Sequence, residues 1–203
     1  MLFRSNGDGL TDIVRVRKGD IRYWPGRGDG TFGTGPLGCA GGTFSTGSYV
    51  QMADSPWYTD PDDSGLRFND VNGDGTADLV QIRFQNVDVW YNVDGRGWQN
   101  RRILDNTPAS PSYQQRVRLV DVNGSGTPDI LWGDGLAYKY IDLQGGTRPW
   151  LLNRVENGLG KTTEVAYTTS VEHMLAAEKA GNGWDKKCPT VLHMVERVTV
   201  LDG

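Results

Sequence analysis

Two stretches of the sequence place carboxylate and amide side chains at alternate positions, an arrangement that can bind a hard cation. Residues 70–80 read DVNGDGTADLV and residues 121–131 read DVNGSGTPDIL, and seven of the first nine positions are identical. Oxygen donors suit Ca²⁺, and the intervening glycines permit the sharp turn that would bring alternate side chains to one point. The question is whether these stretches bind calcium or only close turns.

The stretch beginning at residue 70 carries the fullest set of oxygen donors. Positions 1, 3, 5, 7 and 9 are Asp70, Asn72, Asp74, Thr76 and Asp78, with Thr76 offering its backbone carbonyl. An EF-hand would place Glu at position 12 and a helix after it, but position 12 is Gln81 and a strand pattern follows. We therefore expect a calcium loop between strands. Its ion would stabilise a hairpin, because a catalytic metal needs an open position and a nearby base.

The other two copies of this loop carry fewer donors. The third offers Asp121, Asn123, Ser125, Thr127 and Asp129, and the first offers Asn6, Asp8, Leu10 and Asp12. Ser125 removes one carboxylate, while Arg4 puts a positive charge at the first ligand position. Calcium affinity is expected to fall from the second loop to the third and then to the first. The alternative is that Asp and Asn side chains accept hydrogen bonds from turn amides without metal.

The loops belong to an internal repeat that must position them. A shift of 66 residues aligns 6–9 with 72–75, and a further shift of 51 carries Asp78 to Asp129. Apolar residues alternate with polar ones on both sides of each loop, which indicates strands. A unit of about 50 residues with three or four short strands and a Trp fits one β-propeller blade.

These patterns predict a mainly β fold with two parts. The first is a partial β-propeller over residues 1–148, with repeats at about 1–65, 66–115 and 116–148, because three copies do not close a ring of four to eight blades. A Gly-, Ser- and Pro-rich insertion at about 33–65 would form a long loop and, with the other loops at that end of the blades, the main contact surface.

The second part, residues 149–203, is predicted to be a small β-rich segment with one short helix, truncated at its C-terminus. Strands are expected at 151–155, 162–167 and 189–201, and the last of them has no evident partner in the sequence. Thr169 with Glu172 three residues later is a capping-box signature for the helix, and Gly181 suits its end. Val171, Met174, Leu175 and Glu178 would share one side of that helix.

Composition and charge exclude several classes of function. A formal net charge of −4 without a basic cluster argues against nucleic acid as a partner. No signal peptide and no apolar run of about 18 residues is visible, so we expect no direct membrane insertion. The protein would be secreted, or would lie in the bacterial cytoplasm before release. Cys39 and Cys188 are not in metal-ligand spacing, and two free thiols are favoured over a disulfide.

Neither an enzyme nor an adhesion protein is favoured by the remaining residues. No GxSxG, Walker or HExxH sequence is present, and His173 and His193 are interpreted as ordinary structural residues. No catalytic residue is therefore assigned. Arg27-Gly28-Asp29 spells RGD, but it aligns with a hairpin turn of the next repeat. Trp24 and Trp90 recur at one repeat position, which favours core packing, whereas Trp57 and Trp98 are the candidates for sugar binding.

The motifs resemble known protein families. The frame D-x-N-x-D-G-x-x-D, followed by VDVWYN and a glycine turn, resembles FG-GAP/VCBS propeller repeats, whose loops bind Ca²⁺ in integrin α subunits. The later WLLNRVENGLGKTTEVAY, a short helix and PTVLHMVERVTVLDG resemble the TcdB middle/N-terminal region of Tc insecticidal toxin B components. This part is also similar to SpvB-like and Rhs-associated proteins.

The resemblance implies a non-catalytic virulence function. In Tc toxins the propeller of the B component docks onto an A-type translocation component and gates a shell that encloses the toxic part of a C-type Rhs component. The alternative function is a calcium-stabilised adhesion or glycan-binding propeller module.

Overall fold

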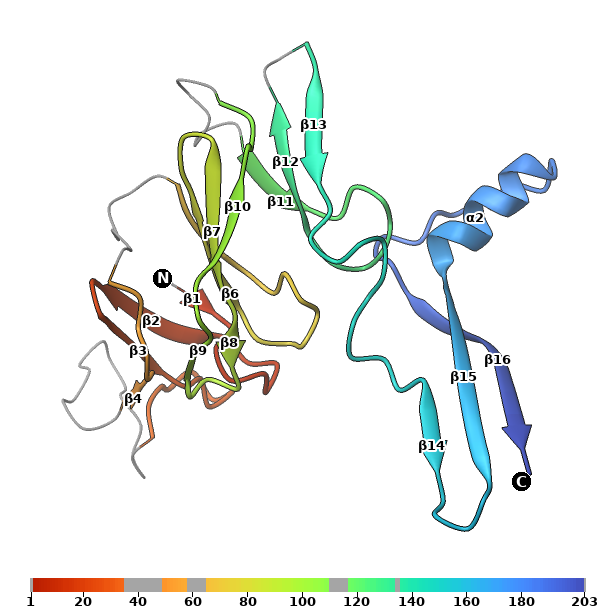
Figure 1. Cartoon of the computed structure of the whole chain (residues 1–203), viewed down its shortest axis with the longest axis horizontal. Helices are drawn as coiled ribbons and strands as arrows, with labels where there is room; N and C mark the ends of the chain where they lie inside the picture. The colour runs from red at the N-terminus through yellow and green to blue at the C-terminus, as the bar shows by residue number, and fades with distance from the viewer. Residues whose placement is uncertain (1, 35–48, 58–64, 110–116, 134–135, 203) are drawn as a thin grey trace. The chain divides into compact units, whose positions relative to one another are not determined.

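The computed structural model describes residues 2–34, 49–57, 65–109, 117–133 and 136–202 (Figure 1). The chain divides into two compact units. The first comprises residues 1–120 and 128–143, and the second comprises residues 121–127 and 144–203. The expected mainly β fold with one short helix is confirmed for the described residues. Most of the insertion predicted at 33–65 lies outside them, as does Cys39, and Cys188 is a free cysteine.

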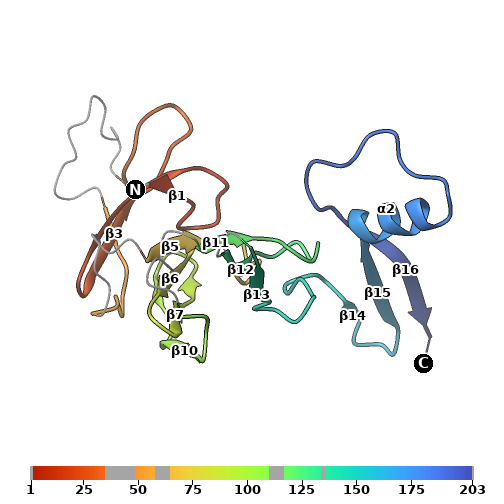
Figure 2. The ribbon, with the colours of Figure 1, turned by 90° about the horizontal axis from the view of Figure 1, so that it is seen from above.

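Three antiparallel sheets build the first unit, one for each copy of the repeat (Figures 1 and 2). The first sheet has the order β1-β2-β3-β4, formed by Leu2–Phe3, Asp12–Arg17, Asp20–Trp24 and Val50–Gln51. The second has the order β10-β7-β6-β5, formed by Arg102–Asp105, Asn86–Trp90, Asp78–Ile82 and Leu66–Asn69. The third contains β11, β12 and β13, formed by Val117–Val120, Asp129–Gly133 and Tyr138–Ile141. In each sheet an acidic loop joins the two strands that come first in the chain: β1 and β2, β5 and β6, and β11 and β12.

A small hairpin of β8 (Asn92–Val93) and β9 (Gly97–Trp98) lies between strands β7 and β10 of the second sheet. The repeat register is the same in the first two sheets, since Ile13 pairs with Trp24 and Leu79 pairs with Trp90. Strand β6 is buried along its whole length, so the second sheet is covered on both faces.

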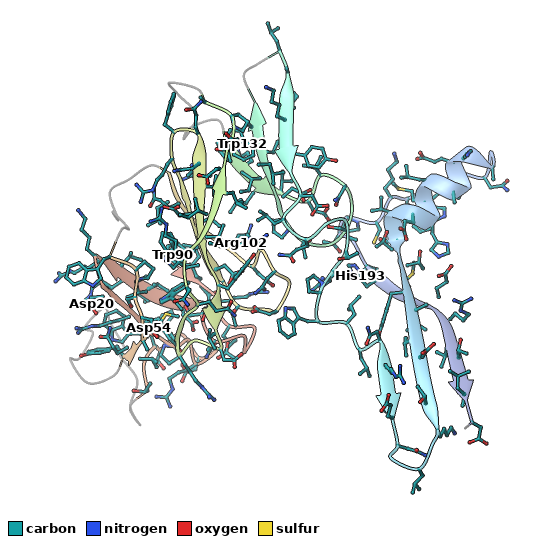
Figure 3. The ribbon with its side chains drawn as sticks, viewed as in Figure 1. Asp20, Asp54, Trp90, Arg102, Trp132 and His193 are labelled. Atoms are coloured by element: carbon teal, nitrogen blue, oxygen red, sulfur yellow. The ribbon has the colours of Figure 1, made fainter. Side chains whose placement is uncertain are left out.

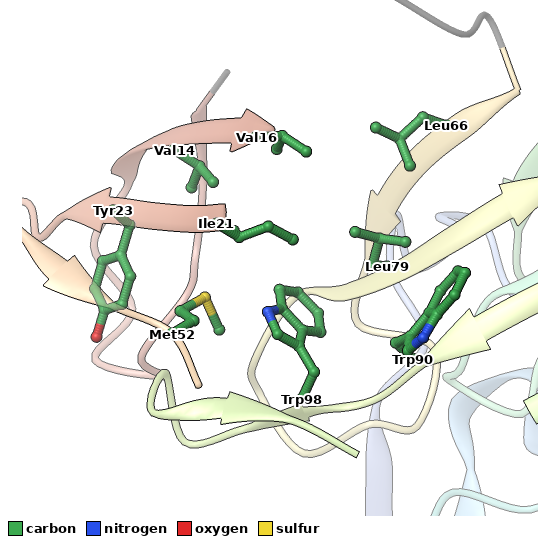
Figure 4. Close-up of a cluster of buried hydrophobic side chains, with 9 residues drawn as sticks. All are labelled: Val14, Val16, Ile21, Tyr23, Met52, Leu66, Leu79, Trp90 and Trp98. Atoms are coloured by element: carbon green, nitrogen blue, oxygen red, sulfur yellow. The ribbon is translucent and has the colours of Figure 1, made fainter. Parts of the chain in front are cut away.

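Two hydrophobic clusters pack the three sheets face to face. The first lies between the first and second sheets and contains Val14, Val16, Ile21, Tyr23, Met52, Leu66, Leu79, Trp90 and Trp98 (Figure 4). The second lies between the second and third sheets and contains Val71, Val80, Ile82, Val87, Val89, Val117, Ile130 and Trp132. Burial of each large apolar side chain stabilises the fold by roughly 1.5–3 kcal/mol. The apolar residues at alternate strand positions therefore hold the sheets against one another.

The second unit is a three-stranded antiparallel sheet with one helix. Strands β14 (Arg154–Glu156), β15 (Thr162–Thr169) and β16 (His193–Leu201) stand in that order, and α2 (Ser170–Lys179) follows β15. The capping box is present as predicted: Glu172 N–H donates to the Thr169 hydroxyl at 3.1 Å, and Thr169 N–H donates to the Glu172 carboxylate at 2.9 Å.

The sequence-based expectations for this unit need three corrections. The final strand was expected to have no partner, yet β16 pairs with β15 from Thr169↔His193 to Thr162↔Leu201. Both outer strands are also shorter than predicted, because 151–153 and 189–192 form no strand. The proposed apolar side of the helix is only partly covered, since Leu175 is 54% exposed. None of the helices in the described residues is long and apolar enough to cross a membrane.

Candidate functional site

The loop between β5 and β6 is closed by the side chain at its first position. The Asp70 carboxylate accepts backbone N–H groups from Gly73 at 2.7 Å, from Asp74 at 3.1 Å and from Gly75 at 2.9 Å. Gly73 and Gly75 have φ of 79° and 91°, a conformation that favours glycine. Burial raises the pKa of Asp70, and the three amide donors oppose that increase.

The next two predicted ligands also bond inside the loop. The Asp74 carboxylate accepts the N–H of Thr76 at 2.8 Å and its hydroxyl at 2.6 Å. The Asn72 side chain accepts the Asp74 N–H at 2.9 Å and donates to the Asp74 carboxylate at 2.9 Å. Asp70, Asn72 and Asp74 are thus brought into one turn, as their spacing predicts, and each of them satisfies turn groups.

Asp78 ends the loop in a fully buried position. Its carboxylate accepts the Val71 N–H at 3.0 Å and the Asn92 N–H at 2.9 Å. Burial raises the pKa of Asp78 to about 7, the nearby Asp74 and Asp70 add to the increase, and the two amide donors oppose it. Asp78 therefore links both ends of the loop to the start of the β8–β9 hairpin.

Asn92 is a residue of this site that sequence reasoning missed. Its buried side chain donates to the carbonyls of Ser5 at 2.8 Å and Ala77 at 3.1 Å, and it accepts the Gly95 N–H at 2.9 Å. Ser5 belongs to the first loop, so Asn92 joins two repeats. The local sequence holds no signal for this role, because the partner lies 87 residues away.

The first loop repeats part of this arrangement. Asp8 accepts the Leu10 N–H at 2.8 Å, and Asn6 accepts the Asp8 N–H at 3.3 Å. Asp12 is buried and accepts the N–H of Ser5 and, at 2.9 Å, that of Gly26, which matches the two amides held by Asp78. Burial raises the pKa of Asp12, and the amide donors oppose the increase.

The third loop is closed in the same way as the second. Asp121 accepts N–H groups from Gly124 at 2.7 Å, Ser125 at 3.0 Å and Gly126 at 2.7 Å, and Asn123 accepts the Ser125 N–H at 2.9 Å. The hydroxyls of Ser125 and Thr127 lie 3.0 Å apart, and both residues are buried. Asp129, the last predicted ligand, is also fully buried.

A loop can hold a metal ion only if its acidic side chains point to one position. Among the described residues, no group of three or more His, Cys, Asp or Glu side chains is placed so that it could hold a metal ion. The first donors of each loop accept amides of their own turn, and Asp12 and Asp78 also accept the amides of Gly26 and Asn92 beyond it. Calcium binding therefore stays a prediction, and the contacts that the structure provides are those of self-closed turns.

The other residues singled out in the sequence have structural surroundings. The GRGDG stretch is a turn in which the Arg27 N–H donates to the Thr31 carbonyl at 3.1 Å and Asp29 accepts the Thr31 N–H at 2.9 Å. Trp24, Trp90 and Trp98 are buried, so Trp98 presents no surface to a sugar, whereas Trp57 is 74% exposed.

A buried charge cluster also escaped sequence reasoning. Asp88 is fully buried in β7 and forms ion pairs with Arg83 at 2.8 Å and Arg101 at 3.0 Å. The alternation of NVDVW indicates that Asp88 lies on the face opposite Val87 and Val89, but it does not indicate that this face is buried.

Comparison with known structures identifies the class of fold. Over 99% of its length the chain is similar to a segment of the crystal structure of TcdB2-TccC3 without its hypervariable C-terminal region, with a TM-score of 0.73 and 21% identity. It also matches the Photorhabdus luminescens Tc holotoxin pore, with a TM-score of 0.71 and 19% identity over its full length. The chain spans 9% of the length of each of those chains. The fold is that of a segment of a Tc toxin B-component protein.

The sequence places the chain in a family. Residues 95–203 match the family described as the insecticide toxin TcdB middle/N-terminal region, and the chain belongs to this family. No curated protein matches the chain. The resemblance to Tc toxin B components is thereby confirmed, while the FG-GAP/VCBS and SpvB-like resemblances stay predictions.

Proposed function

We propose that the chain is a non-catalytic part of a released Tc toxin complex. It would contribute propeller blades to a B-type protein that docks onto an A-type translocation component and gates a toxin-enclosing shell. The observation that carries the proposal is the family match together with the regular stacking of the repeat sheets.

The stacking supports blades because equivalent residues of the first two sheets pack against the sheet that follows each of them. On the face toward the following sheet, the cross-strand pairs are Val14↔Tyr23 and Val16↔Ile21, then Val80↔Val89 and Ile82↔Val87, then Leu131↔Tyr140 and Gly133↔Tyr138. The first two sets form the inner surface of the two hydrophobic clusters. One sheet cannot bury both of its faces alone, so blades of a propeller need neighbours on both sides.

The third set differs from the first two in its exposure. Tyr138 is 73% exposed and Tyr140 is 50% exposed, whereas their equivalents Val87 and Val89 are 0% and 1% exposed. The Tyr138 ring lies over Gly133, where a Cβ atom would come within 2.9 Å of it. We infer that this aromatic face packs against a further sheet in the assembled toxin, as the same positions do in the first two sheets.

The partners follow from what the similar structures contain. TcdB2 is recorded in complex with TccC3, and a second similar chain belongs to a Tc holotoxin pore. By analogy, this chain would work with a C-type Rhs component and an A-type component.

Co-purification tests this assignment. A B-type protein that contains residues 1–203 should form a stable complex with the C-type component of the same toxin, and that complex should bind the A-type component with submicromolar affinity. If the purified components remain monodisperse and separate in size-exclusion chromatography and interferometry, the proposed role is wrong.

Calcium in the loop of residues 70–78 is a separate proposal. Asp70, Asn72, Asp74 and Asp78 supply hard oxygen atoms to the same turn, and an ion there would stabilise the hairpin without taking part in a reaction. Calorimetric titration of the chain with CaCl₂ tests it, because Asp70→Asn should abolish the heat of binding.

A further inference from the structure

One glycine position separates the third acidic loop from the other two. Gly9, Gly75 and Gly126 are equivalent in the repeat and have φ of 82°, 91° and 84°. No atom lies within 4 Å of a Cβ built at Gly9 or Gly75, whereas a Cβ at Gly126 would collide with the ring of His193. The third loop is therefore covered at the point where the first two are open.

The covering residue makes a specific bond to the loop. His193, at the start of β16 (Figure 3), places Nε2 at 2.9 Å from the backbone carbonyl oxygen of Ser125. A carbonyl oxygen only accepts, so Nε2 carries the proton and donates. Helix α2 adds an apolar contact, because a Cβ at Gly124 would lie 2.9 Å from Val171 Cγ1. Both glycines thus permit an approach that a side chain would prevent.

The residues of the third loop suit its covered position. Ser125 stands where the second loop has Asp74, and Ser125 and Thr127 are 5% and 1% exposed with their hydroxyls in contact. A carboxylate at 125 would lose hydration in this position, and such a loss is costly without a paired charge. The neutral serine instead satisfies its hydroxyl within the loop and its carbonyl through His193.

We propose that residues 121–127 form a seat for α2 and β16 of the same chain. In this seat the His193 ring and the Val171 side chain stabilise the loop in place of a metal ion. The seat fixes the start of β16 and the first turn of α2, and it takes up no Ca²⁺. The sequence alone ranked this loop second of the three in expected calcium affinity. The contacts of Gly124, Ser125 and Gly126 instead favour a loop that binds no calcium.

Matched glycine substitutions test the seat. Gly126→Ala and Gly75→Ala impose the same left-handed backbone cost, but only the first displaces His193. Hydrogen exchange of the whole chain should show amides of α2 and β16 exchanging about tenfold faster in Gly126→Ala and unchanged in Gly75→Ala. Equal exchange of α2 and β16 in the two variants would overturn the proposal.

Histidine substitutions give a second measurement if Gly126→Ala perturbs folding. His193→Ala should accelerate the same amides, and His193→Phe should restore part of the protection through packing alone. His173→Ala is the control, because His173 is exposed on the helix. Protection that is unchanged in His193→Ala refutes the seat.

Calcium uptake gives the third measurement. Asp121→Asn keeps an acceptor for the three loop amides and removes a carboxylate, so titration with CaCl₂ should give the same stoichiometry as the unmodified chain. A decrease by one ion would show that the third loop binds calcium, contrary to the proposal.

Discussion

At the scale of single residues, the recurring element is a buried aspartate that receives two backbone amides. Asp12 and Asp78 each join the start of their loop to a segment 14 residues further along. The spacing of the acidic residues in the sequence identified both positions. It did not identify their role, because a ligand and an amide acceptor require the same residue type.

Removing one of these carboxylates leaves two buried amides without an acceptor. We expect Asp78→Ala to lower the free energy of unfolding by about 2–6 kcal/mol, since each of the two unsatisfied buried amides costs roughly 1–3 kcal/mol. Chemical denaturation measures the change, with Asp105→Ala on the exposed edge strand β10 as the control. A loss below that of the control would contradict this account of Asp78.

Calcium binding by the second loop would also raise the thermal stability of the chain. If the second loop binds the ion, millimolar CaCl₂ should raise the melting temperature of the unmodified chain by a few degrees, as for a ligand that binds only the folded state. Asp70→Asn should show no such increase. An identical increase in both proteins would place the ion elsewhere.

At the scale of elements, local patterns predicted the capping box and the strand pairs that share a hairpin, because their partners lie a few residues apart. Contacts over long separations were not predictable. Asn92 bonds Ser5 at a separation of 87 residues, and His193 bonds Ser125 at a separation of 68. The pairing of β16 with β15 was missed for the same reason, since α2 and its connection separate the strands.

The capping box makes helix α2 sensitive to pH. Hydrogen bonds from Thr168 and from the Thr169 N–H lower the pKa of Glu172 below its usual value. A lowered folded-state pKa contributes stability that is present above about pH 4.5 and is lost as the pH falls through the folded-state pKa. Circular dichroism should therefore show helix loss beginning just below pH 4.5.

Glu172→Gln isolates this contribution. The amide keeps an acceptor but not the charge, so the pH dependence of α2 should weaken while most of the helix remains at pH 7. Thr169→Ala should cost about 1 kcal/mol at every pH, as for other N-cap substitutions. Retention of the full pH dependence in Glu172→Gln would show that another group is responsible.

At the scale of the whole molecule, the repeat register accounts for which faces are buried and which are open. The first two sheets bury the positions that the third sheet exposes through Tyr138 and Tyr140. The sequence predicted the three repeats because they share one register. The repeat alignment also places Tyr138 and Tyr140 at the positions of Val87 and Val89, but it could not show that these tyrosines are exposed, since that requires the packing of the sheets.

Hydroxyl-radical footprinting of Tyr138 and Tyr140 tests the central claim most directly. The proposed stacking in a Tc toxin B-type protein predicts that both rings are reactive in the isolated chain of residues 1–203 and strongly protected in the assembled complex with the C-type component. The exposed Trp57 provides a reference for general reactivity in the same samples. Tyrosines that stay as reactive in the complex as in the isolated chain would contradict the account.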